Sequence, residues 1–308
     1  MRYHILFALF LSINLLAQED NSIANNEEQL RYWPNGELQT RDRFKNGKKD
    51  GLSEEFSRNG TLLERTNYKN GKKDGLSEEF SWGGVLTKRA NYKDGEKDGL
   101  FEVFSTNGTL RERTNYKNGK KDGLSEEFSW EGVLTERVNY KDGEEDGLYV
   151  QYYATGNVKR KINYKDGEWH GPFETCHYIT DVFYLVFDLS EYYKDCLIEN
   201  TGNYKDGERH GSFKRYFKNG DLSKMESFQD GIRDGLQEDY YNSGQLKEQI
   251  IVKNGKQDGV SKYYYESGKV MIIESFKNGK RDGFQELYNE NGQLKKQVLY
   301  RDGERVDK

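Results

Sequence analysis

Apolar and polar residues alternate along most of the chain in short runs. Residues 76–80, Leu-Ser-Glu-Glu-Phe, place their Leu and Phe on one side of an extended strand and their Ser and second Glu on the other. Residues 62–68 form a longer run in which Leu62, Thr66 and Tyr68 are expected to share a side. Alternation of this kind is typical of half-buried strands, and no stretch shows a convincing helical period. The pattern predicts an all-β protein.

Short turns that contain glycine separate these runs. Arg58-Asn59-Gly60 suits a three-residue hairpin turn with the glycine in the left-handed region. This turn sets Phe56 across from Leu62 on the apolar face, whereas a two-residue Asn59-Gly60 turn would place them on opposite faces. The three-residue turn is therefore favoured, and consecutive strands are expected to pair antiparallel in chain order, as a meander.

The runs recur every 24 residues over nearly the whole chain. The aromatic residue of an Asn-Tyr-Lys-Asn-Gly motif marks the phase, and all but two of the 33 glycines fall at three positions of the period. Such regular glycines indicate tight turns that need a positive φ. The marker occurs at Phe44, Tyr68, Tyr92, Tyr116, Tyr140 and Tyr164, and after a gap of 40 residues at Tyr204, Phe228, Val252, Phe276 and Tyr300. The period predicts about 22 strands in one elongated antiparallel sheet, on the order of 100 Å long.

The repeat also predicts how side chains divide between the two faces of the sheet. Each repeat gives the apolar face a Leu, a Phe or Tyr, a Leu or Val, and a Tyr, which only neighbouring repeats can help to bury. On the outward face, Glu79 is expected diagonally across from Arg89, and Glu127 across from Arg137. Exposed pairs of this kind add little stability, but they favour solubility and a fixed register.

Part of the array is a recent duplication. Residues 59–100 and 107–148 differ at only 5 of 42 positions. Duplicating a catalytic centre serves little purpose, whereas duplicating a pair of strands lengthens a surface. The duplication therefore favours a binding scaffold over an enzyme.

The composition narrows the class of protein further. Only 33% of the residues are hydrophobic and 33% are charged, so a single large core is not expected. The 23 Tyr and 16 Phe, however, are too many for a solvated, disordered chain. The net charge of −5, from 53 acidic and 48 basic residues, indicates no basic surface of the kind that binds nucleic acid.

The N-terminal residues have the pattern of an export signal. Arg2 and His4 precede an apolar run from Ile5 to Leu16, and Ala17 follows as a small residue for cleavage. We therefore expect a helical signal peptide at 1–17, a linker at 18–29 and the repeat array at 30–304. The protein is predicted to be exported to the periplasm, the cell surface or the medium, with an uncleaved membrane anchor as the alternative.

The turn motifs resemble those of a known repeat family. Residues 164–171 (Tyr-Lys-Asp-Gly-Glu-Trp-His-Gly) and 204–211 are similar to the core of a MORN repeat, and the added Asn-Gly-x-Leu turns at 59–62 and 291–294 resemble the bacterial MORN-repeat variant family. Members of that family are often labelled YwqK-type antitoxins. The resemblance covers about residues 30–304 and implies a meandering antiparallel sheet used for protein or membrane-surface contacts. It implies no catalytic residues.

The two cysteines flank the one irregular repeat. Cys176 takes the phase of a strand aromatic, Cys196 takes that of a turn glycine, and a 16-residue insertion separates the regular phases. An elongated hairpin near 177–195 would hold both cysteines on its arms, so a disulfide is favoured in an oxidising compartment. The alternative is a zinc site of Cys176, His177 and Cys196, although no Cys-x-x-Cys spacing supports it.

The insertion contains Val182–Leu189, the most apolar stretch after the signal. Such a hairpin either folds back onto the sheet or binds a partner. In the second case Phe183, Tyr184 and Phe187 are the candidate partner-binding residues.

Other motifs are explained as structural. His170 and His210 replace the turn aspartate found at Asp74 and are expected to make the same turn hydrogen bonds. The Asp-Gly-x-x-Asp-Gly turns lack the calcium-loop pattern, and paired carboxylates such as those of residues 54 and 55 point to opposite faces of a strand. No Ser/His/Asp constellation is available. We therefore expect no catalysis, no cofactor and no metal.

The sequence leaves two functions open. The first is a non-enzymatic exported scaffold for protein–protein interaction, either antitoxin- or immunity-like or part of a cell-envelope assembly. Its partner would be another, unidentified protein, and a homodimer through the apolar face is a further option. The second is a module that binds carbohydrate or a lipid surface through rows of exposed aromatic residues.

Overall fold

The computed structural model describes residues 26–178 and 196–306, and every regular element in these ranges is a β-strand. The predicted signal helix and nearly all of the inserted hairpin lie outside the described residues. The described residues contain no helix of the length and apolarity needed to cross a membrane. The strands are β1 (Asn26–Tyr32), β2 (Leu38–Lys45), β3 (Lys48–Lys49), β4 (Gly51–Phe56), β5 (Leu62–Lys69), β6 (Lys72–Phe80), β7 (Leu86–Lys93), β8 (Glu96–Phe104), β9 (Leu110–Lys117), β10 (Lys120–Phe128), β11 (Leu134–Lys141), β12 (Glu144–Tyr152), β13 (Val158–Lys165), β14 (Glu168–Cys176), β15 (Ile198–Lys205), β16 (Glu208–Arg209), β17 (Gly211–Tyr216), β18 (Leu222–Gln229), β19 (Ile232–Tyr240), β20 (Leu246–Lys253), β21 (Lys256–Gln257), β22 (Gly259–Tyr264), β23 (Val270–Lys277), β24 (Lys280–Arg281), β25 (Gly283–Tyr288), β26 (Leu294–Arg301) and β27 (Glu304–Arg305).

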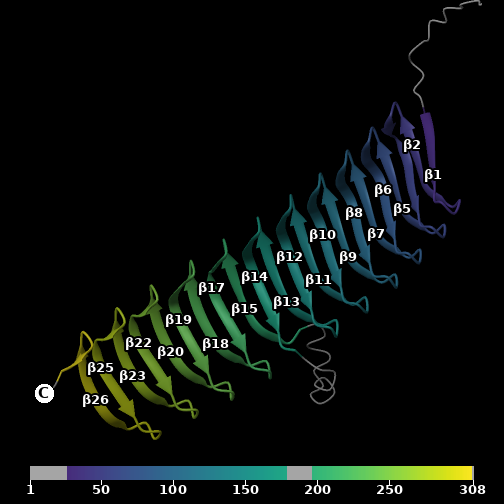
Figure 1. Cartoon of the computed structure of the whole chain (residues 1–308). Helices are drawn as coiled ribbons and strands as arrows, with labels where there is room; N and C mark the ends of the chain where they lie inside the picture. Colours follow the sequence, from purple (N-terminus) through teal and green to yellow (C-terminus); the bar gives the residue numbers. More distant parts are fainter. Residues whose placement is uncertain (1–25, 179–195, 307–308) are drawn as a thin grey trace, which may run out of the picture.

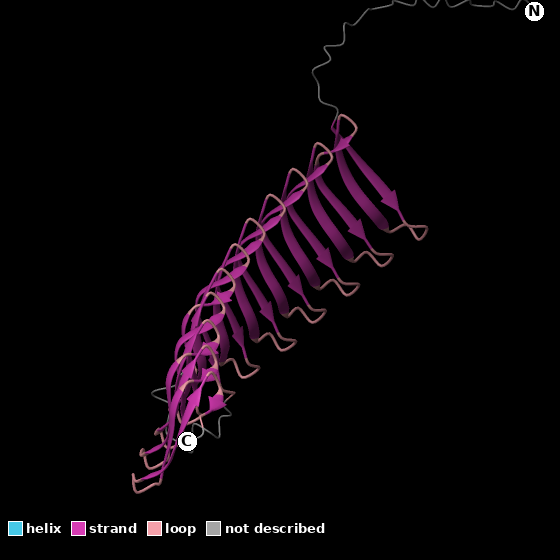
Figure 2. Ribbon diagram, turned by 90° about the vertical axis from the view of Figure 1, so that its left-hand side faces the viewer, coloured by secondary structure: helices cyan, strands magenta, loops and turns pink. Residues whose placement is uncertain are grey.

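All 27 described strands form one open antiparallel sheet in chain order. Each strand pairs with the next along the chain, except that β3/β4, β16/β17, β21/β22 and β24/β25 are two pieces of one strand and both pair with the strand before them. Figure 1 shows the sheet as a long single-layered ribbon with turns along both of its edges. In Figure 2 the N-terminal strands are seen face-on and the C-terminal strands nearly edge-on, so the ribbon twists along its length, as sheets do. The predicted all-β meander is confirmed. Four repeats divide their first strand into two pieces; counting each as one strand and omitting β27 leaves the 22 strands expected from the period.

Two kinds of turn alternate along the ribbon. At one edge, Asn70 and Gly71 both have positive φ, 49° and 84°, which makes a two-residue type I′ turn. The Gly71 N–H donates to the Lys49 carbonyl of the preceding repeat at 2.8 Å, and the Asn70 N–H donates to the Asp50 carboxylate at 3.1 Å. These bonds join each repeat to its neighbour.

At the other edge, the predicted three-residue turn and its register are confirmed. Phe56 pairs with Leu62, the Ser57 N–H donates to the Thr61 carbonyl at 2.8 Å, and Gly60 has a φ of 80°. A β-bulge follows directly, because Glu55 pairs with Glu64 and Leu63 is the extra residue.

The bulge corrects the predicted division of side chains between the faces. Residues directly paired across two antiparallel strands share a face, so Leu62 lies with Phe56. Thr66 and Tyr68 pair with Ser53 and Gly51, which alternate to the opposite face. The prediction that Leu62, Thr66 and Tyr68 share a side is therefore wrong, because the extra residue in the bulge changes the phase of the alternation. We call the face with Tyr68 the tyrosine face and the face with Phe56 the ladder face.

The core of the sheet is a single file of side chains along the midline of the tyrosine face. Members of this midline file pair directly across successive strands, and most of them are buried although the described residues form no second layer over the sheet. They include Thr66, Ser77, Ala90, Phe101, Thr114, Ser125, Val138, Tyr149, Ile162, Phe173, Gly202 and Phe213. In the centre, Val138, Tyr149 and Ile162 form an apolar cluster, against which Tyr164 and Trp169 pack.

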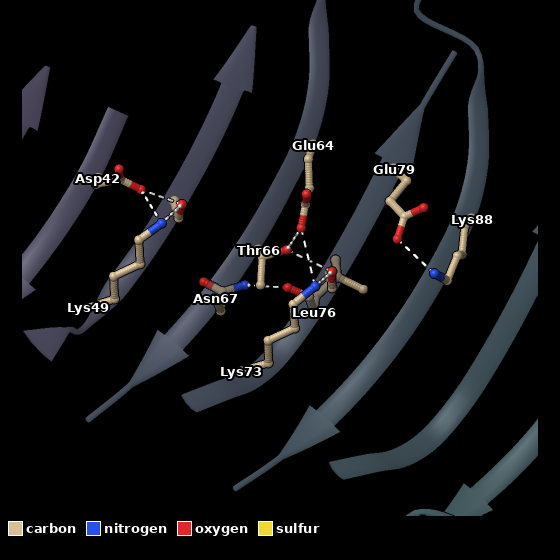
Figure 3. A network of polar contacts seen from close by, with 11 residues as sticks. Asp42, Lys49, Glu64, Thr66, Asn67, Lys73, Leu76, Glu79 and Lys88 are labelled. Carbon is tan, nitrogen blue, oxygen red and sulfur yellow. Dashed lines mark hydrogen bonds and ion pairs between the residues drawn. The ribbon is translucent and has the colours of Figure 1, made fainter. Parts of the chain in front are cut away.

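Long side chains on either side of this file cover it. In Figure 3, Lys73 reaches Glu64 at 3.2 Å and Lys88 reaches Glu79 at 2.7 Å, while the Thr66 hydroxyl donates to Glu64 at 2.9 Å. On the turn side, tyrosines alternate with cations, as where the Lys73 ammonium lies 5.4 Å from the centre of the Tyr92 ring. Amphipathic side chains thus do the covering that a second layer does in a sandwich.

The ladder face carries a continuous row of alternating arginine and glutamate residues, which corrects the predicted ion pairs. Arg89 binds Glu78 at 3.1 Å, whereas Glu79 lies on the tyrosine face and pairs with Lys88. Likewise, Arg137 binds Glu126 at 2.7 Å, not Glu127. The predicted partners are wrong because they follow from the same miscounted alternation. The row consists of Arg41, Glu54, Arg65, Glu78, Arg89, Glu102, Arg113, Glu126 and Arg137.

The glutamates of this row are shielded from solvent. The side chain of Glu78 is 3% exposed. Burial alone would raise its pKa, but hydrogen bonds and charges from Arg65 and Arg89 outweigh burial and hold the pKa below its ordinary value of 4.5. Glu78 is therefore a charged anchor between two strands at neutral pH.

Candidate functional site

A shallow groove of about 300 Å³ crosses the tyrosine face where β14, β15, β16, β17 and β18 lie side by side. The tyrosine face has three rows of side chains: the midline file, the row of tyrosines and cations on its turn side, and a third row on its other side that includes Glu64 and Glu79. The groove contains residues from all three rows. They are Trp169, Phe173, Asn200, Tyr204, Arg209, Phe213, Arg215, Lys224 and Glu226, with Thr201 and Lys214 beside them.

Aromatic rings form the floor of the groove. The centres of the Trp169 and Tyr204 rings are 4.8 Å apart, and Tyr204 also meets Phe173 and Phe213 edge to face at 5.4 Å. These are favourable geometries for aromatic pairs. Gly202 lies in the middle of the floor, where an added Cβ would come within 2.6 Å of Phe173 and 2.7 Å of Phe213. The missing side chain allows the two phenylalanine rings to meet over the backbone.

Two exposed arginines stand on this floor without a carboxylate partner among the described ion pairs. The Arg209 guanidinium lies 5.2 Å from the centres of both the Phe213 and the Phe228 rings. The Arg215 Nε donates to the Asn200 side-chain oxygen at 3.3 Å. In the ladder row, by contrast, each arginine binds a glutamate. The groove therefore offers guanidinium groups that can still bind an anion.

The wall toward the C-terminus is electrically mixed. Lys224 lies 3.5 Å from both Glu226 and Asp239, and Arg233 binds Glu226 at 2.7 Å. A second hollow of about 230 Å³ continues along the same face and shares Lys224 and Glu226. In it, burial and then the charge of Asp239 raise the pKa of Glu248 above its ordinary value.

Of the predicted site residues, the structure describes the two cysteines, and neither of them lines the groove. Cys176 and Cys196 form a disulfide with Cα atoms 5.3 Å apart, at the end of β14 and just before β15. Both sulfur atoms are used in this bond, so the alternative zinc site has no thiolate; the described residues hold no cluster of three or more metal-ligating side chains. Phe183, Tyr184 and Phe187 lie outside the described residues.

The two turn histidines behave differently from each other. The Asp206 N–H donates to His170 Nδ1 at 3.5 Å, the bond that the turn aspartates accept elsewhere. Both rings also approach the aspartate of the next turn, with 3.2 Å from His170 Nδ1 to the Asp206 carboxylate and 3.3 Å from His210 Nδ1 to the Asp230 carboxylate, but His210 Nδ1 accepts no backbone hydrogen bond. The prediction is confirmed for His170 and wrong for His210.

The sequence reading missed the groove because its residues are far apart in the chain and meet only through strand pairing. One signal was available. Gly202 is one of the two glycines outside the three regular turn positions, and its backbone does not have the positive φ of a turn. Such a glycine indicates close packing from a neighbour.

Exposed aromatic residues mark one edge of the ribbon. Trp82 is 77% exposed and Trp130 is 72% exposed, and both occupy the same position of the three-residue turn; Tyr178, 55% exposed, has the equivalent position where the insertion begins. The Arg111 guanidinium lies 4.3 Å from the centre of the Trp130 ring. Large aromatic surfaces exposed at regular positions bear on the second function that the sequence leaves open.

Comparisons with known proteins bear on the fold and the family. No curated protein matches the chain. Among solved structures, the chain is similar to one titled "Crystal Structure of TcdB2-TccC3", with 12% identity over 87% of this chain and 16% of that one, at a TM-score of 0.19. A second is titled "Structure of Photorhabdus luminescens Tc holotoxin pore, Mutation TccC3-D651A", with 12% identity over 89% of this chain and 17% of that one, at a TM-score of 0.17. The chain spans less than a fifth of the length of either.

The sequence model of one family matches seven segments of 22 residues, half of the chain. These are residues 49–70, 97–118, 145–166, 209–230, 233–254, 257–278 and 281–302. Each segment runs from the end of one two-residue turn through the three-residue turn to the next, and so covers one hairpin of the meander. The chain belongs to the MORN repeat variant family.

Proposed function

We propose that the protein is a non-enzymatic, exported repeat scaffold that binds a partner protein through the groove on the tyrosine face. The observation that carries this proposal is the pair of exposed arginines, Arg209 and Arg215, which stand on an aromatic floor and for which no ion pair with a carboxylate is described. Arginine and aromatic residues are enriched where protein surfaces bind tightly. An open face on a long repeat array is also the surface that such folds use for partners.

The export signal in the sequence supports a place in the cell envelope or outside the cell. An antitoxin- or immunity-like role and a role in envelope assembly both fit a scaffold of this kind. In either role the protein would act by holding a partner, and the groove has no nucleophile beside a base that would suggest chemistry.

A second function has its own observation. Trp82 and Trp130 are more than two-thirds exposed at one edge of the ribbon, where tryptophan is suited to a carbohydrate or lipid surface. This alternative uses the edge and leaves the groove unused, so one experiment separates the two.

The test places a photoreactive amino acid at one of two neighbouring positions on β14. Thr175 pairs with Asn200 beside the groove, whereas Glu174 points to the ladder face and is the matched control. Cross-linking in intact cells should give a protein adduct from position 175 and none from position 174. No protein adduct from position 175, which the edge-binding alternative predicts, or equal adducts from both positions, would contradict the proposed function.

A further inference from the structure

The third row of the tyrosine face, on the side of the midline file away from the tyrosines, changes from acidic to basic side chains at the groove. This charged row runs parallel to the midline file, and each member pairs directly with the next across the strands. Before the groove it is acidic, with Glu112, Glu127 and Glu136 on consecutive strands. The row continues as Gln151, Arg160, Thr175, Asn200, Arg215 and Lys224, and then becomes acidic again at Asp239 and Glu248.

The residues from Arg160 to Lys224 form a short cationic window. They occupy five adjacent strands, which at about 4.8 Å per strand spans about 19 Å. An extended peptide of about six residues has the same length at about 3.3 Å per residue. The window therefore has the size of a short segment, with acidic residues at both of its ends.

Two arginines of the window, Arg160 and Arg215, stand in positions where an anion would be favourable. Arg215 pairs directly with Lys224, and like charges directly opposite each other destabilise a sheet. Lys224 has two carboxylates within 3.5 Å, but Arg215 has only the Asn200 amide. Arg160 Nε is buried with no hydrogen-bond partner, and Arg160 Nη2 donates to the Tyr149 hydroxyl at 3.3 Å. Arg160 and Arg215 lie three strand spacings apart, about 14 Å, so two separate carboxylates along one segment would be needed, one at Arg215 and one at the outer nitrogens of Arg160.

We propose that this window binds a short, extended acidic segment of the partner protein, with Arg160 and Arg215 on its carboxylates and the Trp169–Tyr204 floor beside it. This inference rests on the proposed function and adds the chemistry of the partner. The planar guanidinium fork matches a carboxylate in two parallel hydrogen bonds. Between the two arginines, the Asn200 amide donates to the Thr175 hydroxyl at 2.8 Å, and that hydroxyl donates to the Glu199 carboxylate at 3.4 Å.

The flanking acids favour a peptide over a long polyanion. A sulfated polysaccharide that covered the window would continue over Glu136 on one side and over Asp239 and Glu248 on the other. A segment of about six residues ends before either acidic stretch. The charges of this row therefore select a ligand by its length as well as by its negative charge.

The test measures binding of defined peptides to the purified protein by fluorescence anisotropy. The probe is a labelled peptide of about eight residues in which glutamate alternates with serine, and its control replaces each glutamate with glutamine. We expect the acidic peptide to bind at least tenfold more tightly than its control, and Arg215→Gln to weaken it about tenfold, since a hydrogen-bonded charged group contributes on that order. Lys262→Gln, which removes a cation from the ladder face, should change binding less than about twofold. Far-UV spectra check that both variants fold.

Each outcome decides the inference. Equal binding of the two peptides, or an unchanged affinity in Arg215→Gln, would overturn it. Dextran sulfate that binds more tightly than the acidic peptide and displaces it would show a polyanion site instead. If no acidic peptide binds while position 175 still gives a protein adduct in cells, the proposed function stands and the acidic segment does not.

Discussion

Replacing Gly202 with alanine should destabilise the protein, although the same change elsewhere in a strand is usually favourable. Gly202 lies within β15 without a positive φ, so alanine can adopt its backbone conformation. Restricting the unfolded chain in this way normally stabilises a protein by about 0.4–1 kcal/mol. Here the new Cβ would lie 2.6 Å from Phe173 Cε1 and 2.7 Å from Phe213 Cδ1 and Cε1. Carbon atoms pack best at about 3.5–4.0 Å, so both rings must move by roughly 1 Å.

Overpacking of this kind typically costs about 1–3 kcal/mol, which exceeds the entropic gain. We expect Gly202→Ala to lower the free energy of unfolding by about 1–2 kcal/mol. Urea denaturation followed by tryptophan fluorescence and by circular dichroism measures it. Trp169 is a suitable reporter because its ring lies 4.8 Å from the Tyr204 ring.

A double-mutant cycle shows whether the clash is the cause. Phe213→Leu alone should destabilise the floor, but in the Gly202→Ala background it makes room for the new methyl group. The two changes should therefore couple by about 1 kcal/mol, with the double variant more stable than the sum of the single effects predicts. If Gly202→Ala is as stable as the parent, or the two effects simply add, then the rings do not meet over Gly202 as described.

Three further predictions concern the array as a whole. Glu78→Gln should destabilise the protein by about 1–3 kcal/mol in denaturant titrations, since it removes a buried charge from two arginines, whereas Glu79→Gln should change stability by less than about 0.5 kcal/mol. The folded state lowers the pKa of Glu78, so the contribution of Glu78 to stability is complete above about pH 4.5 and is lost as the pH falls through the lower pKa of the folded state. The parent should therefore lose more stability than Glu78→Gln on acidification, and equal losses in the two proteins would contradict this. Deleting residues 69–92 should give a folded protein one repeat shorter, while a 12-residue deletion should not fold, as judged by far-UV spectra and proteolysis. Reducing the Cys176–Cys196 bond should raise hydrogen exchange at the adjoining strand ends and leave distant repeats unchanged; uniform loosening of the sheet would refute this local role.

The fold could be predicted from the sequence because its determinants are local. The positive φ of Asn70 and Gly71 requires the residue types that the sequence provides there, and the turn at Gly60 sets the pairing of Phe56 with Leu62. Each local feature recurs every 24 residues, so the repeats support one prediction many times.

The faces of the sheet could not be assigned correctly, because one inserted residue reverses the alternation. The extra residue of the bulge is Leu63, and its equivalents in the next two repeats are Thr87 and Arg111. These three residues have no chemical property in common that would mark a bulge in the sequence. Counting by twos from Leu62 therefore gives the wrong face for Tyr68 and for every residue after the bulge. Only the pairing of strands shows that glutamate 78, and not glutamate 79, meets Arg89.

The groove lies where the interactions that hold neighbouring strands together change from ion pairs to aromatic packing. Up to Arg137, the ladder face holds neighbouring strands together through buried glutamates. The next members of that row are Val150, Lys161 and Glu174, and the one ion pair among them is 3.7 Å long with both side chains more than a third exposed. In the same strands the aromatic contacts of the tyrosine face become continuous, from Tyr149 to Phe228. Packing on one face thus replaces ion pairs on the other. It follows that the rings of the groove contribute to folding, so changes that are meant to test binding must spare the rings and alter only Arg160, Arg209 and Arg215, for which no ion pair is described.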